Sequence, residues 1–142
     1  MEMIIPAIAE NEAFARMVIS AFLVQADPSL SVVSEIRTAV SEAITNAVVH
    51  AYPENEPGQI SMKAILDQNK VEILIEDFGC GIEDVEQAMK PFYTTKPEHE
   101  RTGMGFSLMM SFMDGVTVYS LPGSGTTVRM TKLLTCIQKD AV

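Results

Sequence analysis

Apolar residues recur every three or four positions in three segments of the chain, and this spacing predicts three amphipathic helices. The first covers residues 10–25, the second runs from near Ser31 to about Ala51, and the third covers residues 104–114. Ser31 or a close neighbour can cap the second helix, and Pro53 ends it. The apolar face of the first helix is Phe14, Val18, Phe22 and Val24, and that of the second is Val33, Ile36, Val40, Ala43, Ile44 and Ala47.

Shorter apolar runs bounded by turn residues predict five strands. Pro6 places the first of them at a sheet edge, because proline cannot donate a hydrogen bond to a neighbouring strand. Gln68–Asn69 and the glycine-rich residues 123–125 each join two runs, which predicts two hairpins. The order of elements indicates a single α+β domain, with a mixed and mostly antiparallel sheet covered by helices on one face. The five runs are residues 1–8, 59–67, 70–77, 115–122 and 126–134.

The composition agrees with one globular domain. The chain has 142 residues, of which 47% are hydrophobic, and this suffices for a core. The net charge of -9 argues against a protein that grips nucleic acid through its phosphates. Cys80 and Cys136 are too few for a disulfide framework or a four-ligand zinc site. The first residues do not resemble a signal peptide and no apolar run is long enough to cross a membrane, so we expect a cytoplasmic protein.

Glu42, Asn46 and His50 follow one another at four-residue spacing in the otherwise apolar second helix. This spacing puts the three side chains on one side of the helix. An ordinary solvated stripe would account for the pattern. A catalytic stripe would also account for it, with Glu42 taking a hydroxyl proton and Asn46 offering its amide oxygen to Mg²⁺.

Asp77, Gly79 and Gly81 directly follow an apolar strand. Turn formation alone can explain these residue types. Alternatively, Asp77 accepts a hydrogen bond from the amino group of a planar base, while the glycines let the backbone approach the ligand closely. The letters DFG also occur in protein kinases, but this chain lacks the other kinase motifs and is too short for that fold.

Three further features can serve a nucleotide or be purely structural. Gly103 and Gly105 open a helix, where backbone N–H groups can meet phosphate, or they form a hinge. Thr126 directly follows the turn residues 123–125 and can bond a base or a bridging water. The polar segment before Gly103 is either a solvated loop or a lid whose cations close over polyphosphate. The cationic and hydroxyl residues of this segment are Lys90, Thr94, Thr95, Lys96 and Arg101.

The order of these motifs resembles the GHKL ATPase/kinase superfamily, whose members share the Bergerat ATP-binding fold. The order is E-x-x-x-N on a helix, D-x-G-x-G after a strand, a basic lid, G-x-G-x-x-L at a helix, and G-T-T before the last strand. Within the superfamily, the stretches ENEAFAR, VSEAITNAVVHAY, FYTTKPEHERTGMGFSLM and FMDGVTV are similar to the anti-sigma factor serine kinases. The resemblance covers nearly the whole chain, from about residue 1 to 135.

The resemblance implies a homodimer that sequesters a sporulation sigma factor of the sigma F type. It also implies that the protein uses ATP and Mg²⁺ to phosphorylate a serine on a small anti-anti-sigma protein of the STAS type, with ADP as the other nucleotide. By match to the family motifs, Glu42 is the catalytic base, Asn46 the Mg²⁺ ligand and Arg16 a partner contact. The residues implied to bind nucleotide are Asn46, Asp77, Gly79, Gly81, Thr95, Lys96, Arg101, Gly103, Gly105 and Thr126.

Two positions depart from the family pattern. Ala51 stands where glycine is frequent, and Phe78 stands where an acidic or amide residue is usual. Neither change removes a functional atom. Three other interpretations stay open: a nucleotide-gated sigma-binding module without kinase activity, an anti-sigma kinase of a general stress pathway, and the ATP domain of a sensor histidine kinase.

Overall fold

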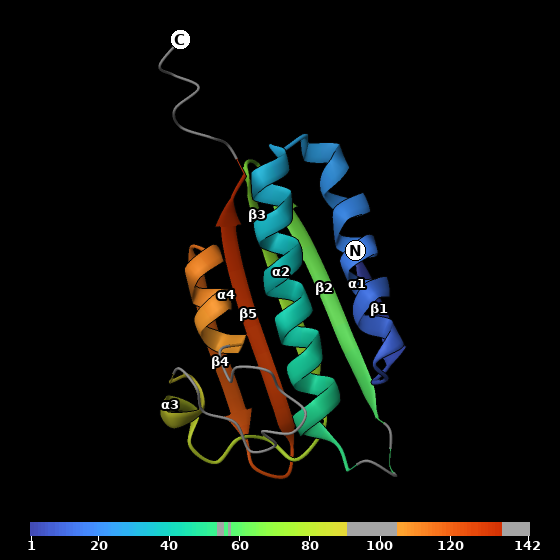
Figure 1. Cartoon of the computed structure of the whole chain (residues 1–142), viewed down its shortest axis with the longest axis vertical. Coiled ribbons are helices and arrows are strands. Elements are labelled where there is room, and N and C mark those ends of the chain that lie inside the picture. The colour runs from blue at the N-terminus through green and yellow to red at the C-terminus, as the bar shows by residue number, and fades with distance from the viewer. Residues whose placement is uncertain (54–55, 57, 91–104, 135–142) are drawn as a thin grey trace.

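A five-stranded sheet with helices on one of its faces forms the body of the protein (Figure 1). The computed structural model describes residues 1–53, 56, 58–90 and 105–134. The strand order is β1-β2-β3-β5-β4, and each of the four pairings among these strands is antiparallel. The strands are β1 (Glu2–Pro6), β2 (Gln59–Asp67), β3 (Lys70–Asp77), β4 (Gly115–Leu121) and β5 (Gly125–Leu133).

The α+β architecture and both hairpins are therefore confirmed, and β1 with Pro6 lies at an edge of the sheet as expected. The expectation of a mixed sheet is wrong for the described strands. The long connection after β3 brings the chain back through β4 at the other edge, and β5 then inserts between β4 and β3, antiparallel to both.

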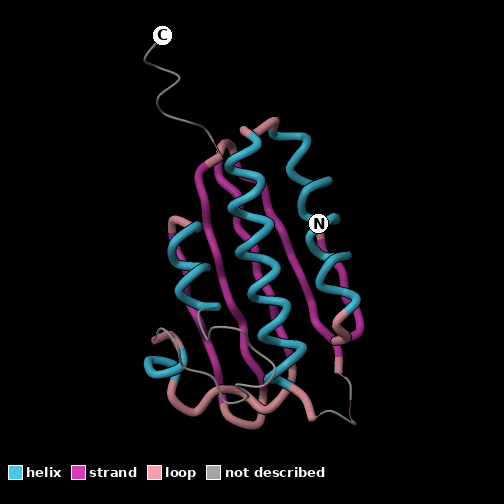
Figure 2. The backbone as a smooth tube through the Cα atoms, viewed as in Figure 1, coloured by secondary structure: helices cyan, strands magenta, loops and turns pink. Residues whose placement is uncertain are grey.

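Helices α1 (Glu10–Leu23), α2 (Leu30–Asn46) and α4 (Gly105–Phe112) all lie on the same face of the sheet, with α2 in the middle (Figures 1 and 2). A 3₁₀ turn (Val24–Ala26) follows α1, and a π turn (Ala47–Ala51) continues α2. The polar segment before Gly103, residues 86–103, was expected to be a loop, but its first residues 86–88 belong to the short helix α3 (Val85–Ala88). Throughout the described part of the chain, every helix falls short of the length and apolarity that crossing a bilayer requires.

The core lies between α2 and the sheet. Helix α2 buries Ile36, Val40, Ala43 and Ile44, as its periodicity predicts, whereas Val33 stays half-buried. From the sheet, the fully buried side chains of β2, β3 and β5 meet this face. They include Ile60, Met62, Ile73 and Met130. Burial of these apolar side chains away from water is the main stabilising contribution to such a fold.

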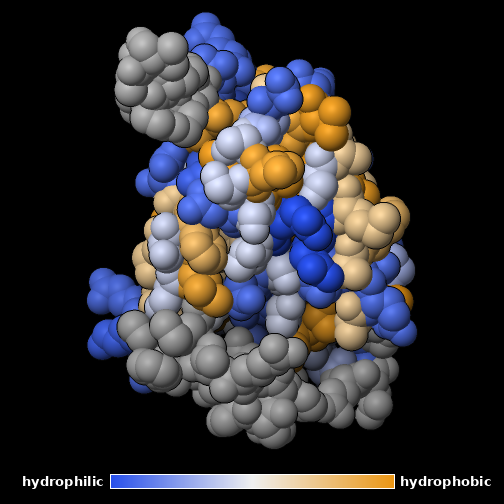
Figure 3. Space-filling view, turned by 45° about the horizontal axis from the view of Figure 1, so that its top comes forward, coloured by the Kyte–Doolittle hydropathy of each residue, from blue (hydrophilic) through white to orange (hydrophobic). Residues whose placement is uncertain are grey.

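The buried face of α1 differs from the predicted one. Ala15, Ile19 and Leu23 are fully buried, whereas Phe14 is 48% exposed and Val24 is 73% exposed. The segment carries two neighbouring apolar stripes one residue apart, so periodicity alone could not choose between them. The stripe that contains the small Ala15 is the one that packs against α2. Other apolar side chains of α1 therefore remain on the surface (Figure 3).

Ser29 caps the N-terminus of α2, in line with the expected cap at Ser31 or a close neighbour. Its backbone is extended (φ -65, ψ 158), and its hydroxyl accepts a hydrogen bond from the backbone N–H of Val32 at 3.3 Å. This bond satisfies one of the N–H groups that the first turn of a helix leaves without a partner.

We expect Ser29→Ala to lower the free energy of unfolding by about 1 kcal/mol, because the cap bond is lost. Urea unfolding followed by circular dichroism measures this change. Ser34→Ala is the matched control, since Ser34 is an exposed serine inside the same helix and caps nothing. Equal effects of the two substitutions would contradict the capping role.

Candidate functional site

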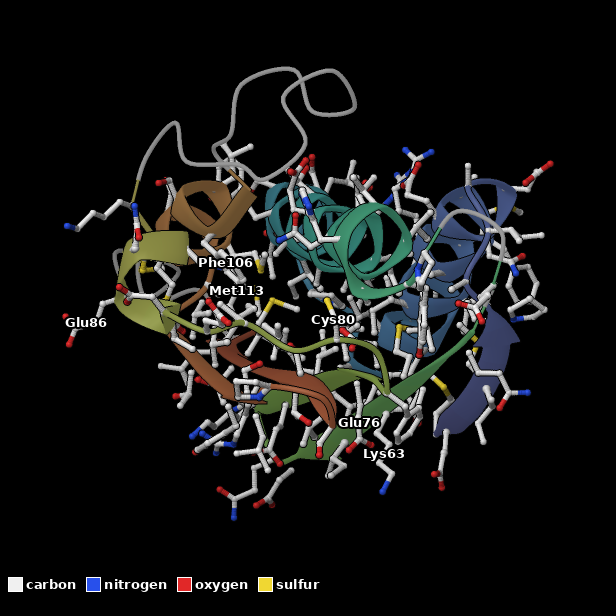
Figure 4. The ribbon with its side chains drawn as sticks, turned by 90° about the horizontal axis from the view of Figure 1, so that it is seen from below. Lys63, Glu76, Cys80, Glu86, Phe106 and Met113 are labelled. Carbon is white, nitrogen blue, oxygen red and sulfur yellow. The ribbon has the colours of Figure 1, made fainter. Side chains whose placement is uncertain are left out.

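A cavity of about 470 Å³ opens between the C-terminal end of α2, the loop after β3, the start of α4 and β5. Its lining includes five of the residues that the sequence nominated. In Figure 4, Phe106 and Cys80, which also line the cavity, lie between the helical layer and the sheet, while Lys63 and Glu76 point away from the other face of the sheet. The five nominated residues are Asn46, Asp77, Gly81, Gly105 and Thr126.

Asp77 is the last residue of β3 and only 8% exposed. Its Oδ1 accepts two hydrogen bonds from backbone N–H groups, from Gly79 at 3.0 Å and from Thr126 at 3.2 Å. Within the described residues, both hydrogen bonds that this carboxylate accepts go to Oδ1. Oδ2 is therefore available to a donor in the cavity.

Burial raises the pKa of Asp77 above its ordinary value of 3.8, because desolvation disfavours the charged form. The two backbone hydrogen bonds lower the pKa in part, and the nearby Glu76 carboxylate raises it. A ligand amino group that donated to Oδ2 would replace some of the lost solvation. The site is thus arranged to favour a hydrogen-bond donor over an acceptor at this position.

The glycines after Asp77 let the loop fit between two parts of the structure. A Cβ on Gly79 would lie 2.0 Å from the carbonyl oxygen of Ala51, and one on Gly81 would lie 2.4 Å from that of Leu121. Gly81 also has a φ of +76, which favours glycine. Gly79 is not among the residues that line the cavity. Both glycines are therefore needed for packing of the backbone.

The π turn at the end of α2 contacts this loop. The N–H of Cys80 donates to the carbonyl oxygen of Ala51 at 2.8 Å, and the Cys80 thiol donates to that of His50 at 3.3 Å. π turns occur preferentially at functional sites. No residue pattern predicted this turn, because its residues continue the apolar helical pattern.

Gly105 brings the start of α4 against the polar stripe of α2. A Cβ on Gly105 would lie 3.2 Å from both terminal atoms of the Asn46 side chain and 3.4 Å from Glu42 Oε1. Asn46 and His50 line the cavity, so the polar stripe of α2 opens onto it. Glu42 is half-buried one turn away and does not line the cavity.

Some nominated residues lie elsewhere. Thr95, Lys96, Arg101 and Gly103 fall outside the described residues, as does most of the proposed lid. Arg16 is on α1, where its Nε lies 2.5 Å from Glu12 Oε2. The same carboxylate oxygen accepts a hydrogen bond from the Ser41 hydroxyl at 2.7 Å, so the cation is held against α2.

Sequence reasoning missed two hydroxyl residues that support the site. The Tyr52 hydroxyl donates to the carbonyl oxygen of Gln59 at 2.6 Å and accepts from the N–H of Phe78 at 2.8 Å. The Ser120 hydroxyl accepts from the N–H of Ile82 at 2.7 Å and lies 2.8 Å from the Thr126 hydroxyl. The hairpin register, which pairs Ser120 with Thr126, was the one signal that could have found Ser120.

Comparison with known families and sequences gives consistent matches over most of the chain. A model of the histidine kinase-like ATPase domain matches residues 5–132. An anti-sigma F factor of Thermoanaerobacter sp. (strain X514) is 52% identical over 126 residues, which cover 89% of this chain and 87% of that protein. The anti-sigma F factor of Bacillus subtilis (strain 168) is 48% identical over 128 residues, with coverages of 90% and 88%. That of Pasteuria penetrans is 50% identical, with coverages of 100% and 95%.

Solved structures share the fold. The RsbU and RsbW domains of Rv1364c from Mycobacterium tuberculosis match with a TM-score of 0.68 at 20% identity, over 94% of this chain and 32% of that longer chain. The catalytic domain of histidine kinase ThkA matches with a TM-score of 0.56 at 23% identity, over 72% of this chain and 68% of that one. At these identities the structures show the fold alone, and they confirm the fold class expected from the motif order.

We expect the free energy of unfolding of the wild type, relative to Asp77→Asn, to fall as the pH rises from below 4 to neutral in the absence of nucleotide. The folded pKa is raised, so the folded state binds more protons than the unfolded state in this window, and stability decreases with rising pH. An asparagine would still accept both backbone hydrogen bonds without ionising. Urea unfolding at several pH values measures the difference, and a pH-independent difference would contradict this account.

Proposed function

Because the chain belongs to the anti-sigma F factor family within the histidine kinase-like ATPases, we propose that it is an ATP-dependent protein-serine kinase that also sequesters a sigma factor. One observation carries the proposal. The buried carboxylate of Asp77, held by two backbone N–H groups, faces a cavity that Asn46 also lines. The Asp77 carboxylate, which can accept a hydrogen bond from a base, and the Asn46 amide oxygen, which suits a hard cation, therefore line the same pocket.

The adenine end of the nucleotide belongs at Asp77. Its Oδ2 accepts a hydrogen bond from the exocyclic amino group, with Thr126 beside it and apolar walls that include Ile75 and Val128. A cavity of about 470 Å³ lies in the usual size range for ligand pockets, roughly 300–1,000 Å³. Most of its lining residues are apolar or glycine, and the polar ones include Glu83, Asp84 and Gln87 besides those named above.

The phosphate end belongs near Asn46 and the start of α4. Mg²⁺ prefers oxygen ligands and is often held by one or two protein groups plus substrate phosphates. Asn46 offers one amide oxygen, and among the described residues no cluster of three His, Cys, Asp or Glu side chains could hold a metal by itself. The donor set thus fits Mg²⁺ carried in with the nucleotide, where the ion would neutralise phosphate charge.

Glu42 is the proposed general base. It lies one turn before Asn46 on α2, and Gly105 keeps the start of α4 close to both side chains. A carboxylate in this position can take the proton of a serine hydroxyl as it attacks the terminal phosphate. We further propose that Thr95, Lys96, Arg101 and Gly103 contact the phosphates from the lid.

The protein partners follow from the family. The relatives are named anti-sigma F factors, which supports a sigma factor as a partner. From the motif resemblance we further propose that this sigma factor is of the sporulation type and that the phosphorylated partner is a small STAS-type anti-anti-sigma protein. We place Arg16 at the partner surface, since its side chain is 38% exposed and α1 also carries the exposed apolar residues Phe14 and Met17. We also propose a homodimer in the cytoplasm.

One observation favours a second candidate, a nucleotide-gated sigma-binding module without kinase activity. Glu42 does not line the cavity in this structure. If no rearrangement brings Glu42 to a substrate hydroxyl, nucleotide would serve as a structural ligand only. The two candidates differ in whether label is transferred from ATP to a partner serine.

We expect Glu42→Gln to retain ATP affinity and to lower phosphoryl transfer by roughly 10²–10⁴-fold, the usual contribution of a general base. The assay uses Mg²⁺, γ-labelled ATP and the cognate anti-anti-sigma protein, and it measures acid-stable label on serine. Glu35→Gln is the matched control, because Glu35 is on the same helix and contacts Lys132 at 3.4 Å.

Full transfer by Glu42→Gln would refute the assignment of the base. Absence of label with the wild type, despite measured ATP binding and sigma binding, would favour the second candidate.

A further inference from the structure

We propose that Ser41 is a positioning residue, which acts through the Glu12 carboxylate to hold the Arg16 guanidinium in one orientation for a protein partner. The proposal rests on the partner surface of α1 that is proposed above. Ser41 lies on α2, whereas Glu12 and Arg16 lie on α1. The Ser41 hydroxyl is linked to Arg16 through Glu12, so its effect on a partner bound at Arg16 is indirect.

The Ser41 hydroxyl differs from two other hydroxyls inside these helices. Ser20 and Thr38 donate to the carbonyl oxygen four residues earlier in their own helix, at 2.8 Å and 3.0 Å. Ser41 instead donates across to Glu12 Oε2 on α1, at 2.7 Å. A carboxylate oxygen can only accept, so the serine supplies the proton of this bond. The short distance is typical of a hydroxyl that binds a charged acceptor.

The same carboxylate oxygen contacts the Arg16 guanidinium. Arg16 Nε lies 2.5 Å from Glu12 Oε2, and this contact is an ion pair rather than an aligned hydrogen bond. The Nε atom is buried, although the side chain as a whole is partly exposed. The two terminal nitrogens of the guanidinium are not used in this contact and can donate to an acceptor on a partner. The arginine is therefore held at its inner nitrogen.

The ion pair needs an anchor outside α1, because both of its members are on that helix. Pairs four residues apart on a helix surface are weak by themselves, since two long side chains must lose freedom and solvent screens their charges. Ser41 belongs to α2, whose apolar side is buried under the sheet. Its hydrogen bond fixes the Glu12 carboxylate relative to the core, and the carboxylate restricts the guanidinium. A restricted arginine binds a partner more tightly, because less conformational freedom is lost on binding.

Ser41 directly precedes Glu42, but the two side chains have different neighbours. Ser41 contacts α1, whereas Glu42 Oε1 would be 3.4 Å from a Cβ placed on Gly105, at the start of α4. Loss of the Ser41 hydroxyl should therefore weaken partner binding and leave the nucleotide site intact. Alanine is also a better helix former than serine, so Ser41→Ala does not weaken α2 as a helix.

The alternative role for Ser41 is to fasten α1 to α2. In that case, loss of the hydroxyl would disturb the whole surface of α1 and would weaken a partner whether or not Arg16 is present. Loss of positioning would weaken a partner only while Arg16 has a guanidinium to hold. The two roles therefore differ in a background that lacks the Arg16 side chain.

A double-mutant cycle on the full chain separates the two roles. Calorimetry in the presence of Mg²⁺ and ATP measures the affinity of the cognate sigma F-type factor for the wild type, Ser41→Ala, Arg16→Ala and the double variant. We expect Ser41→Ala to weaken this affinity about three- to tenfold, the usual effect of ordering one long side chain on binding. In the Arg16→Ala background, Ser41→Ala should change the affinity by less than about twofold.

Two controls accompany the cycle. Thr38→Ala removes a hydroxyl one turn earlier on α2 that bonds its own helix, and it should leave the sigma affinity unchanged. The ATP affinity of Ser41→Ala, measured without the sigma factor, should stay within about twofold of the wild type. If Arg16→Ala binds too weakly to measure, Arg16→Lys takes its place, since lysine is a point charge on a flexible stem without the planar fork of arginine.

Wild-type sigma affinity of Ser41→Ala, or an equal loss in the Arg16→Ala background, would overturn the positioning role. A loss of ATP affinity in Ser41→Ala would also overturn it, because α2 itself would then be disturbed. Wild-type sigma affinity of Arg16→Ala would overturn the partner surface on which the proposal rests. Failure of the wild type to bind the sigma factor would overturn the proposed function itself.

Discussion

The two backbone hydrogen bonds to Asp77 Oδ1 are the contact on which the site depends. One comes from Gly79 in the loop after β3, and the other from Thr126 at the start of β5. They join neighbouring strands and a loop through a single buried oxygen. A buried carboxylate is costly unless it is hydrogen-bonded, so the backbone around Asp77 must keep this arrangement. The same bonds leave the second carboxylate oxygen available to a ligand in the cavity, so the proposed recognition would follow from a requirement of folding.

Helix α2 serves the core and the cavity at the same time. One side buries Ile36, Val40 and Ile44 under the sheet, and the polar side brings Asn46 and His50 to the cavity. The π turn that ends the helix holds the glycine-rich loop through the carbonyl oxygen of Ala51. Packing of the core thus determines where the polar side chains stand. A site supported in this way is more rigid than one carried by loops alone.

Most of the fold could be predicted from the sequence, because α2 and the two hairpins have clear periodicities and turn residues. The face of α1 could not, since two adjacent apolar stripes compete and only the contact with α2 decides between them. The cavity residues Asn46, Asp77 and Thr126 follow from motif order, and the structure brings them together. Ser120 could not be found this way, because its contact with Thr126 depends on the cross-strand register of the hairpin.

The close approach of Gly105 to α2 constrains how the sequence can drift. In a helix, alanine is generally more stable than glycine by about 0.5–1 kcal/mol, so selection for stability favours a methyl group. At this position the methyl carbon would lie 3.2 Å from the Asn46 amide, closer than side chains pack comfortably. Helix stability would favour a methyl group at residue 105, whereas the position of the Asn46 amide favours its absence. A lineage adapting to heat can add this methyl group only if the Asn46 side chain shifts by a few tenths of an ångström, and that shift would move an amide that lines the cavity.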